Sequence, residues 1–256
     1  MPDRCKHALD RVRRAQMDPM IGGKIEERQQ RLAILDQTID GLVIFRRILF
    51  RECRHGRFSR DATGNLPTLP AIYPDTLAPV VRTDRDGERE LIMMRWGFPP
   101  PPNLGSAPVT NIRNTKSPYW RGRLKPGFRC LVPVTSFCEW TDSRPEVPHW
   151  FALGDDRPLF AFAGLWRPWT GVRGTKAAPV EGEHLLFAFL TTESNEIVRS
   201  IHAKATPVIV TTPDEFELWL AAPTEEALAL QRPLAAEALK IVAKGKKEDA
   251  DASLRS

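Results

Sequence analysis

The chain has 256 residues, 42% of them apolar, with 37 Lys and Arg against 32 Asp and Glu and a net charge of +5. That length and composition predict a globular protein with a buried core, and no apolar run approaches the ~20 residues of a membrane-spanning helix. The first 60 residues hold 14 basic and 8 acidic side chains, so the rest of the chain holds 23 and 24. A basic surplus confined to the N-terminal quarter is weak support for a nucleic-acid-binding protein.

The N-terminal region combines charge with little periodicity. Residues 1–33 predict a poorly ordered arm without a secretory signal, which favours the cytosol. The segment FRECRHGRFSR (50–60) then sets Cys53 among arginines, at the end of the apolar run GLVIFRRILF (41–50). Nearby positive charge lowers the pKa of a thiol and creates a nucleophile, but an arginine-rich turn is more often a solvated surface. Both interpretations of Cys53 stay open at this point.

The four cysteines show neither a zinc pattern nor a disulfide pattern. No Cys-x-x-Cys spacing occurs among Cys5, Cys53, Cys130 and Cys138. Cys130 and Cys138 lie in apolar, strand-like stretches, where cysteine usually serves as a small buried hydrophobe. We therefore expect reduced thiols, no metal site and no organic cofactor.

Short apolar segments separated by proline and glycine begin at Leu66 and predict a mainly antiparallel β domain. Residues 78–84 and 90–98 flank the turn RDGE (85–88), which predicts a β-hairpin. Five further segments are predicted as strands: RCLVPVTSFCEW (129–140), HWFALGD (149–155), PLFAFAGLW (158–166), HLLFAFLTT (184–192) and TPVIVTT (206–212).

Helices are predicted between and after these strands. The segment 211–223 contains Thr212 as N-cap, Pro213 at the first helical position and Glu215 three residues after the cap, which together predict a helix. Two shorter helices are predicted at 194–202 and 224–233.

Polar side chains with no evident structural task adjoin three apolar strands. Asn111 and Arg113 lie at i and i+2, so on an extended chain they project to the same face and can meet one ligand. Glu139 ends an apolar strand against Trp140, a setting that would raise its pKa towards the range of a general acid. His202 ends a short helix before a strand. Each residue taken alone also fits a turn, a surface cation, a strand end or a helix C-cap.

The joint pattern is more specific than any single residue. Over residues from about 66 to 235, the sequence resembles the SOS-response-associated peptidase (SRAP) family of abasic-site processing proteins, in the family's order and spacing. Six segments carry the resemblance: RWGFPP (95–100), TNIRNT (110–115), RCLVPVTSFCEW (129–140), LFAFAGLW (159–166), FLTTESN (189–195) and IHAKATPVIV (201–210).

The resemblance implies an α+β fold that is mainly antiparallel β, with twisted sheets forming a barrel-like core and short helices at the periphery. It places a single domain at residues 61–240, between an atypical, poorly ordered region (1–60) and a disordered tail (241–256). It also implies a cleft for single-stranded DNA that contains abasic sites. We expect a monomer without membrane partners, acting in the cytoplasm at the nucleoid during SOS-linked DNA repair.

The resemblance also assigns roles to single residues. An abasic deoxyribose hides its aldehyde in a ring, so a group must protonate the ring oxygen before an amine can attack. Glu139 would be the acid/base that opens the sugar, His202 would assist proton transfer, and Asn111 would position the nucleophile. Four more positions would bind DNA: Arg113 at a phosphate, Trp96 and Gly97 in the wall that faces DNA, and Thr191 as a further candidate.

The nucleophile is where this sequence departs from the family. The family's cysteine becomes the first residue once methionine is removed; its α-amine forms a Schiff base and its thiol closes a stable thiazolidine. This chain begins Met-Pro, and His55 stands where that cysteine would precede Gly-Arg-Phe. Cys53 is internal and has no free amine. The nucleophile is therefore unknown, Cys53 is a doubtful candidate, and we expect residues 1–60 to be an altered or mis-framed N-terminus.

The leading hypothesis is an abasic-site processing enzyme of hydrolase or lyase type that binds single-stranded DNA. In the family such a protein forms a covalent thiazolidine cross-link to DNA, and this chain would be inactive for lack of its nucleophile. The alternative is a non-catalytic single-stranded DNA-binding module, in which Arg113 contacts phosphate and Trp96 stacks on bases. A cysteine peptidase is disfavoured because no Cys/His pair is apparent.

Overall fold

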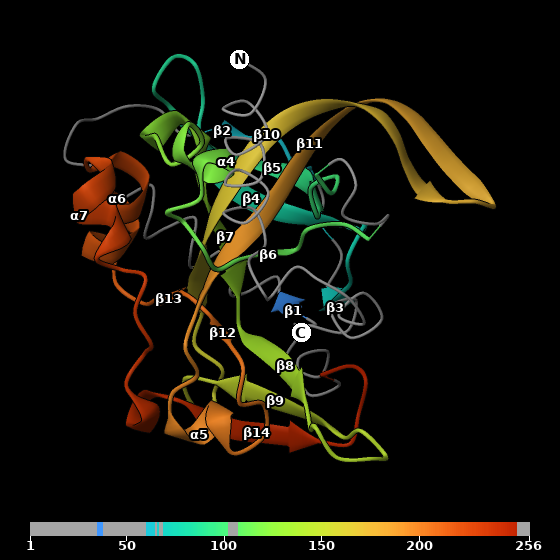
Figure 1. Ribbon diagram of the computed structural model, residues 1–256, viewed down its shortest axis with the longest axis vertical. Helices are drawn as coiled ribbons and strands as arrows, with labels where there is room; N and C mark the ends of the chain where they lie inside the picture. The colour runs from blue at the N-terminus through green and yellow to red at the C-terminus, as the bar shows by residue number, and fades with distance from the viewer. Residues whose placement is uncertain (1–34, 38–59, 65, 67–68, 102–106, 250–256) are drawn as a thin grey trace, which may run out of the picture.

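The computed structural model describes residues 35–37, 60–64, 66, 69–101 and 107–249 (Figure 1). The arm predicted at the N-terminus, Cys53 and His55 lie outside the described residues.

The described chain is built mainly from strands, with a few short helices. The strands are β1 (Leu35–Gln37), β2 (Arg60–Asp61), β3 (Leu69–Ile72), β4 (Leu77–Thr83), β5 (Arg89–Trp96), β6 (Asn111–Ile112), β7 (Arg129–Val134), β8 (Ser136–Trp140), β9 (Pro148–Ala152), β10 (Phe160–Thr175), β11 (Ala178–Thr192), β12 (Thr206–Pro207), β13 (Ile209–Val210) and β14 (Lys240–Lys244). The helices are α4 (Pro118–Arg121), α5 (Glu196–Arg199), α6 (Pro213–Ala221) and α7 (Thr224–Leu228), with 3-10 turns at Pro126–Phe128 and Ala236–Ala238.

Five strands close into a barrel. Neighbours pair antiparallel in the order β11–β10–β7–β4–β5, and β5 returns to β11 through a short parallel pairing that sets Arg95 opposite Leu186. β6 and β12 also pair with β11, β13 with β10, and β2 with β5. The fold predicted from the sequence, mainly antiparallel β with a barrel-like core and short peripheral helices, is confirmed.

Side chains alternate between the two faces of the barrel strands. In β10, Phe160 and Phe162 join one buried cluster, whereas Ala161 and Ala163 join another on the opposite face. Trp219 of α6 packs in the cluster with the alanines, so that face is the outer one. The large rings therefore fill the barrel, and the small side chains leave room for the helices that cover it.

A second sheet, in the order β14–β9–β8–β1–β3, carries one of the candidate site residues. The segment 129–140, predicted as one strand, is two: β7 belongs to the barrel, β8 belongs to the second sheet, and Thr135 lies between them. The chain changes sheets at this break. Glu139 consequently lies on β8, opposite His149 of β9.

The β10–β11 hairpin is much longer than predicted. The sequence predicts strands only at 158–166 and 184–192, but the pairing continues to Thr175 opposite Ala178. The side chains between these segments are exposed or half-buried, so the apolar pattern ends where the ribbon leaves the core. Figure 1 shows this ribbon extending beyond the sheets at the upper right.

Helix α6 begins at the cap predicted from the sequence. The Thr212 hydroxyl accepts a hydrogen bond from the Glu215 N–H at 3.2 Å. The Glu215 carboxylate in turn accepts from the N–H of Thr211 at 2.8 Å, one residue earlier than a standard capping box requires. The other two predicted helices exist but are shorter, since α5 and α7 span only Glu196–Arg199 and Thr224–Leu228.

The C-terminal segment is ordered farther than predicted. Lys240–Lys244 forms β14, which pairs with β9. Asp249, 1% exposed, forms an ion pair with Arg157 at 2.6 Å and accepts a hydrogen bond from the Ser136 hydroxyl at 2.8 Å. The predicted disorder over 241–256 is therefore wrong as far as Asp249, because a buried, paired carboxylate holds this segment; residues 250–256 lie outside the described part.

Candidate active site

Glu139 is a buried carboxyl with no ion-pair partner in the part of the chain that the structure describes. It is 1% exposed, and its Oε2 has no hydrogen-bond partner among the described residues. Burial, first, and the negative charge of nearby Asp142, second, raise the pKa of Glu139 well above its ordinary value. Both causes favour the protonated form of the carboxyl, which is the form that a general acid needs.

Hydrogen bonds to the backbone of His202 hold this residue next to Asp142. Its N–H donates to the Val198 carbonyl at 2.7 Å, and its own carbonyl accepts from the Ser194 hydroxyl at 3.0 Å. The His202 Nδ1 lies 4.0 Å from Oδ1 of Asp142. Asp142 therefore neighbours both Glu139 and His202, and the structure brings these two residues to one part of the molecule. The sequence analysis missed Asp142, whose sole signal was its position three residues after Glu139.

Asn111 and Arg113 enter from the short strand β6. Its parallel pairing with β11 sets Asn111 opposite Phe189 and Ile112 opposite Leu190. The Asn111 Oδ1 is buried and has no hydrogen-bond partner in the part of the chain that the structure describes. The Arg113 side chain is exposed.

Arg113 and Thr191 meet at one pocket of about 320 Å³. The Gln231 amide joins its walls, donating to the carbonyls of Arg113 at 2.9 Å and of Thr191 at 3.0 Å. Lys116 and Glu193 line the same pocket, so it holds two cations and one carboxylate. Two residues that the sequence predicts to bind DNA thus lie together, whereas Gln231 was missed.

Trp96 is a core residue in this structure. Its side chain is fully buried, with ring centroids 5.2 Å from Phe189 and 6.4 Å from Phe187. The indole N–H donates to the Thr110 carbonyl at 3.3 Å. The expectation that Trp96 faces DNA is therefore corrected: the ring fills the barrel and has no exposed face for a base.

Gly97, the next residue, lies where its backbone comes close to Pro108. Its φ is 109°, and a Cβ atom here would lie 2.7 Å from Cβ of Pro108, so the position requires glycine. The Gly97 N–H donates to the Phe187 carbonyl at 2.7 Å, and its carbonyl accepts from Arg173 at 3.1 Å. This fastens the β10–β11 ribbon to the end of β5.

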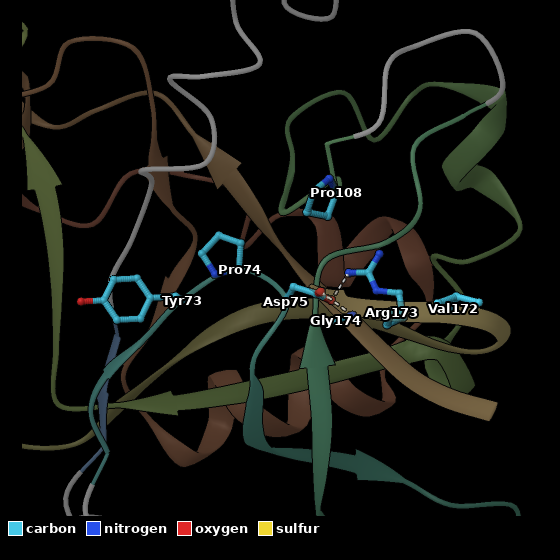
Figure 2. A pocket seen from close by; sticks show the side chains of 7 residues that line it. All are labelled: Tyr73, Pro74, Asp75, Pro108, Val172, Arg173 and Gly174. Atoms are coloured by element: carbon cyan, nitrogen blue, oxygen red, sulfur yellow. Dashed lines mark hydrogen bonds and ion pairs between the residues drawn. The ribbon is translucent and has the colours of Figure 1, made fainter. Parts of the chain in front are cut away.

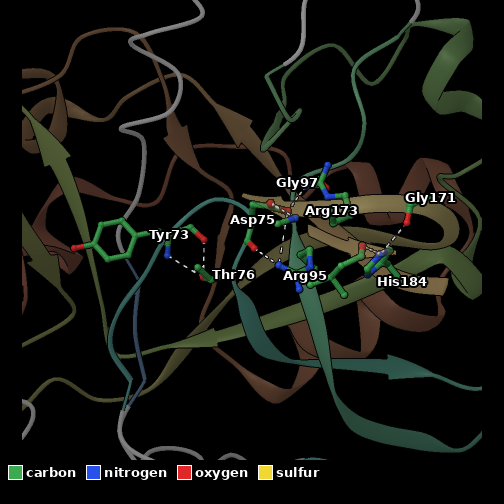
Figure 3. A network of polar contacts seen from close by, with 10 residues as sticks. Tyr73, Asp75, Thr76, Arg95, Gly97, Gly171, Arg173 and His184 are labelled. Carbon is green, nitrogen blue, oxygen red and sulfur yellow. Dashed lines mark hydrogen bonds and ion pairs between the residues drawn. The ribbon is translucent and has the colours of Figure 1, made fainter. Parts of the chain in front are cut away.

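A second pocket, of about 440 Å³, is lined by the loop after β3, by Pro108 and by β10 (Figure 2). Asp75 is at its base: Arg173 lies 2.7 Å and Arg95 3.9 Å from its Oδ1, and the Gly174 N–H donates to its Oδ2 at 2.8 Å. Figure 3 shows these groups converging from the loop after β3, from β5 and from β10. The sequence analysis missed this network because no local pattern joins the three segments.

The two described cysteines are unsuited to nucleophilic attack. Cys130 and Cys138 are both fully buried. Burial raises the pKa of each thiol, and the negative charge of Asp249 raises that of Cys138 further. Cys5 and Cys53 lie outside the described residues.

The described ranges hold neither a cluster of metal-ligating side chains nor a membrane-spanning helix. Within them, no three or more His, Cys, Asp and Glu side chains are grouped so as to hold a metal ion. None of the described helices is both long and apolar enough to cross a membrane.

Comparison with known proteins gives a family match and relatives. The family model described as SOS response associated peptidase (SRAP) matches residues 49–246. The abasic site processing protein YoqW of Bacillus subtilis is 33% identical over 135 residues, which cover 50% of this chain and 55% of that protein. The abasic site processing protein HMCES of Gallus gallus is 30% identical over 179 residues, covering 60% and 53%. The chain spans about half the length of the curated relatives it matches.

Solved structures show the same fold at low identity. A protein from Bordetella bronchiseptica matches with a TM-score of 0.60 and 18% identity over 84% of this chain and 98% of that one. A phage-related protein from the same organism matches with a TM-score of 0.58 and 22% identity, covering 81% and 92%.

Proposed function

Because the chain belongs to the SOS response associated peptidase (SRAP) family, whose matched relatives are named abasic site processing proteins, we propose that it binds single-stranded DNA and acts on abasic sites there. The observation that carries the proposal is Glu139, a buried carboxyl whose Oε2 has no hydrogen-bond partner among the described residues. Asp142 lies near it and also neighbours His202. A structural carboxylate would be paired or exposed, whereas strongly perturbed groups of this kind cluster at functional sites.

The first chemical step opens the sugar ring. An abasic deoxyribose is a cyclic hemiacetal with a hydroxyl on C1′. Glu139 donates its proton to the ring oxygen, the bond from C1′ to that oxygen breaks, and the C1′ hydroxyl gives its proton to neutral His202. The products are an aldehyde, a 4′ hydroxyl, a Glu139 carboxylate and a His202 imidazolium. Asp142, 4.0 Å from His202 Nδ1, stabilises the positive charge that forms.

Arg113 supplies the contact to the DNA backbone. Its guanidinium is exposed at the pocket it shares with Thr191, and Lys116 adds a second cation there. Phosphate contacts of this kind fix the register of a strand without reading its sequence. Asn111, two residues earlier, then positions the group that attacks the aldehyde.

A non-catalytic single-stranded DNA-binding module is the second candidate function. The observation that favours it is the state of Cys130 and Cys138, both buried with raised thiol pKa values. A module that binds the strand without a reactive amine-thiol group would hold abasic DNA and form no cross-link to it.

Binding is tested with the full chain and a single-stranded oligonucleotide that carries one tetrahydrofuran abasic analogue. We expect the affinity to fall with salt, and Arg113→Ala to reduce the slope of log K against log salt by about 1. Arg85→Ala is the matched control, because it removes an exposed arginine at the β4–β5 turn. No binding, or equal effects of the two variants, would contradict the proposal.

Ring opening is tested apart from any attack on the aldehyde. An aminooxy reagent traps the open aldehyde of a true abasic site as an oxime and releases water, so the rate of trapping reports opening. We expect the chain to accelerate trapping and Glu139→Gln to slow it by about 10²-fold or more while binding stays unchanged. Asp75→Asn is the control: it neutralises a carboxylate that pairs with arginines, and it should not slow trapping. Binding without acceleration would establish the non-catalytic module instead.

A further inference from the structure

Gln231 uses its whole side-chain amide on the walls of the Arg113 pocket. Its Oε1 accepts from the Thr115 hydroxyl at 2.8 Å. Its Nε2 donates to the Arg113 carbonyl at 2.9 Å and to the Thr191 carbonyl at 3.0 Å. Both amide hydrogens are thereby used, so the group has no donor left for a ligand.

The Gln231 amide lies just beyond the end of the β6–β11 pairing and links the two strands there. The parallel pairing of β6 with β11 ends at Ile112 opposite Leu190, so Arg113 and Thr191 are the next residues on each strand. Their carbonyls are bridged by Gln231 in place of a backbone pair. On its other side Thr191 pairs with Pro207 of β12, which holds β11 in place. Gln231 therefore ties the backbone of Arg113 to a fixed strand.

The same amide holds the segment that carries Arg113 at two points, the Arg113 carbonyl and the Thr115 hydroxyl. Thr115, 8% exposed, is held by the same amide, and Arg113 itself is exposed. A guanidinium on a long side chain binds a phosphate well only when its stem is fixed, because ordering the side chain loses entropy.

We propose that Gln231 is a positioning residue for the DNA phosphate contact: it fixes the Arg113 backbone against Thr191 so that the guanidinium is presented at the pocket. The inference rests on the proposed function of Arg113 and names a residue that acts through it. Gln231 carries no charge, so any influence on the electrostatic part of binding has to pass through a charged neighbour.

The test measures binding of the tetrahydrofuran oligonucleotide over a series of salt concentrations. The variants are Gln231→Met, which keeps the length of the side chain and removes its hydrogen bonds, Arg113→Ala, and the double variant. We expect Gln231→Met to weaken binding about fivefold with Arg113 present and less than about twofold on the Arg113→Ala background. We also expect it to lower the salt slope, which a merely structural role of an uncharged side chain would not do.

A second pair of variants guards against misfolding of Gln231→Met. Thr115→Val removes the donor to the Gln231 oxygen and should weaken binding in the same direction, whereas Thr115→Ser keeps the hydroxyl and should restore it. Thermal unfolding checks that each protein is folded at the assay temperature.

The outcomes separate this inference from the function on which it rests. If the unmodified chain does not bind, the proposed function is wrong. If it binds and responds to Arg113→Ala, but Gln231→Met has no effect or the same effect on both backgrounds, then Gln231 does not act through Arg113. A weakened affinity with an unchanged salt slope would likewise overturn the positioning role.

Discussion

Asp75 and Glu139 place the same chemical group in opposite surroundings. Asp75 is 27% exposed, yet Arg173, Arg95 and the Gly174 N–H all approach its carboxylate. Glu139 is 1% exposed, and the charged neighbour that acts on it, Asp142, is negative as well. The carboxylate nearer to water has the compensating charges, and the buried carboxyl has none that the structure describes.

The difference separates a structural carboxylate from a chemical one. Pairing with arginine and a backbone N–H lets Asp75 join the β10–β11 ribbon to the loop after β3, so its charge serves the fold. Burial without a cation favours the protonated form of Glu139 and lowers stability wherever that group must ionise. An arrangement that does not serve the fold is the one to examine for catalysis.

The largest expected effect is the pH dependence of Glu139→Gln. In the unfolded chain this group ionises above about pH 4.3. In the folded chain its pKa is raised, so it stays protonated to a higher pH. At a pH between the unfolded-state pKa and the folded-state pKa of Glu139, unfolding releases a proton. The contribution of this group to the wild-type free energy of unfolding therefore falls by about 1.4 kcal/mol for each unit that the pH rises. Glutamine does not titrate. Denaturant unfolding of both proteins from pH 5 to 8 should show the variant gaining stability relative to wild type as pH rises; a constant difference would mean that Glu139 is ionised.

A smaller loss is expected for Asp75→Asn. The amide removes the charge that pairs with Arg173, and we expect the free energy of unfolding to fall by about 1 kcal/mol, less at high salt. Asp155→Asn is the matched control: its pair with Lys240 is 2.8 Å long but exposed, so stability should not change measurably. Equal results for the two variants would show that the Asp75 pairing does not hold the ribbon.

The smallest effect concerns Asp142. Its negative charge is the second cause of the raised pKa of Glu139, after burial, so Asp142→Asn should lower that pKa without restoring its ordinary value. On the Asp142→Asn background, the stability difference that Glu139→Gln produces should then level off at a lower pH than in the wild type. We expect a change below about 1 kcal/mol at pH 8, because Asp142 is half-exposed. If the pH at which the difference levels off does not change, Asp142 does not act on Glu139.

Sequence reasoning reached the parts of the fold that repeat locally. The turn between β4 and β5 was predicted from Asp86 and Gly87, and Gly87 has a φ of 81° there. The short apolar segment PLFAFAGLW (158–166) is predicted as a strand, and its phenylalanines and alanines lie on opposite faces of β10. The same reasoning failed at Thr135, where an unbroken apolar run conceals a change of sheet.

The candidate site divides in the same way. Glu139 and Arg113 are predicted as site residues because each is a polar residue that adjoins an apolar run. Trp96 was placed on the surface because it stands next to Gly97 in a recognisable segment, and the sequence does not say which face of β5 turns inwards. Its burial follows from barrel closure, which sets Trp96 opposite Phe187.

The sequence by itself determined the strand-rich composition of the fold, the hairpin at residues 85–88, the cap of α6 and the polar residues worth testing, because each depends on neighbours within a few positions. Tertiary structure alone decided that Asp142 lies beside His202, that Asp75 pairs with Arg173 and that Gln231 bridges Arg113 and Thr191. These contacts join side chains from distant segments, and a single hydrogen bond or ion pair leaves no periodic signal in either segment. Whether a charged group is neutralised, and hence what it can do, is fixed only when the barrel closes and brings its partner to it.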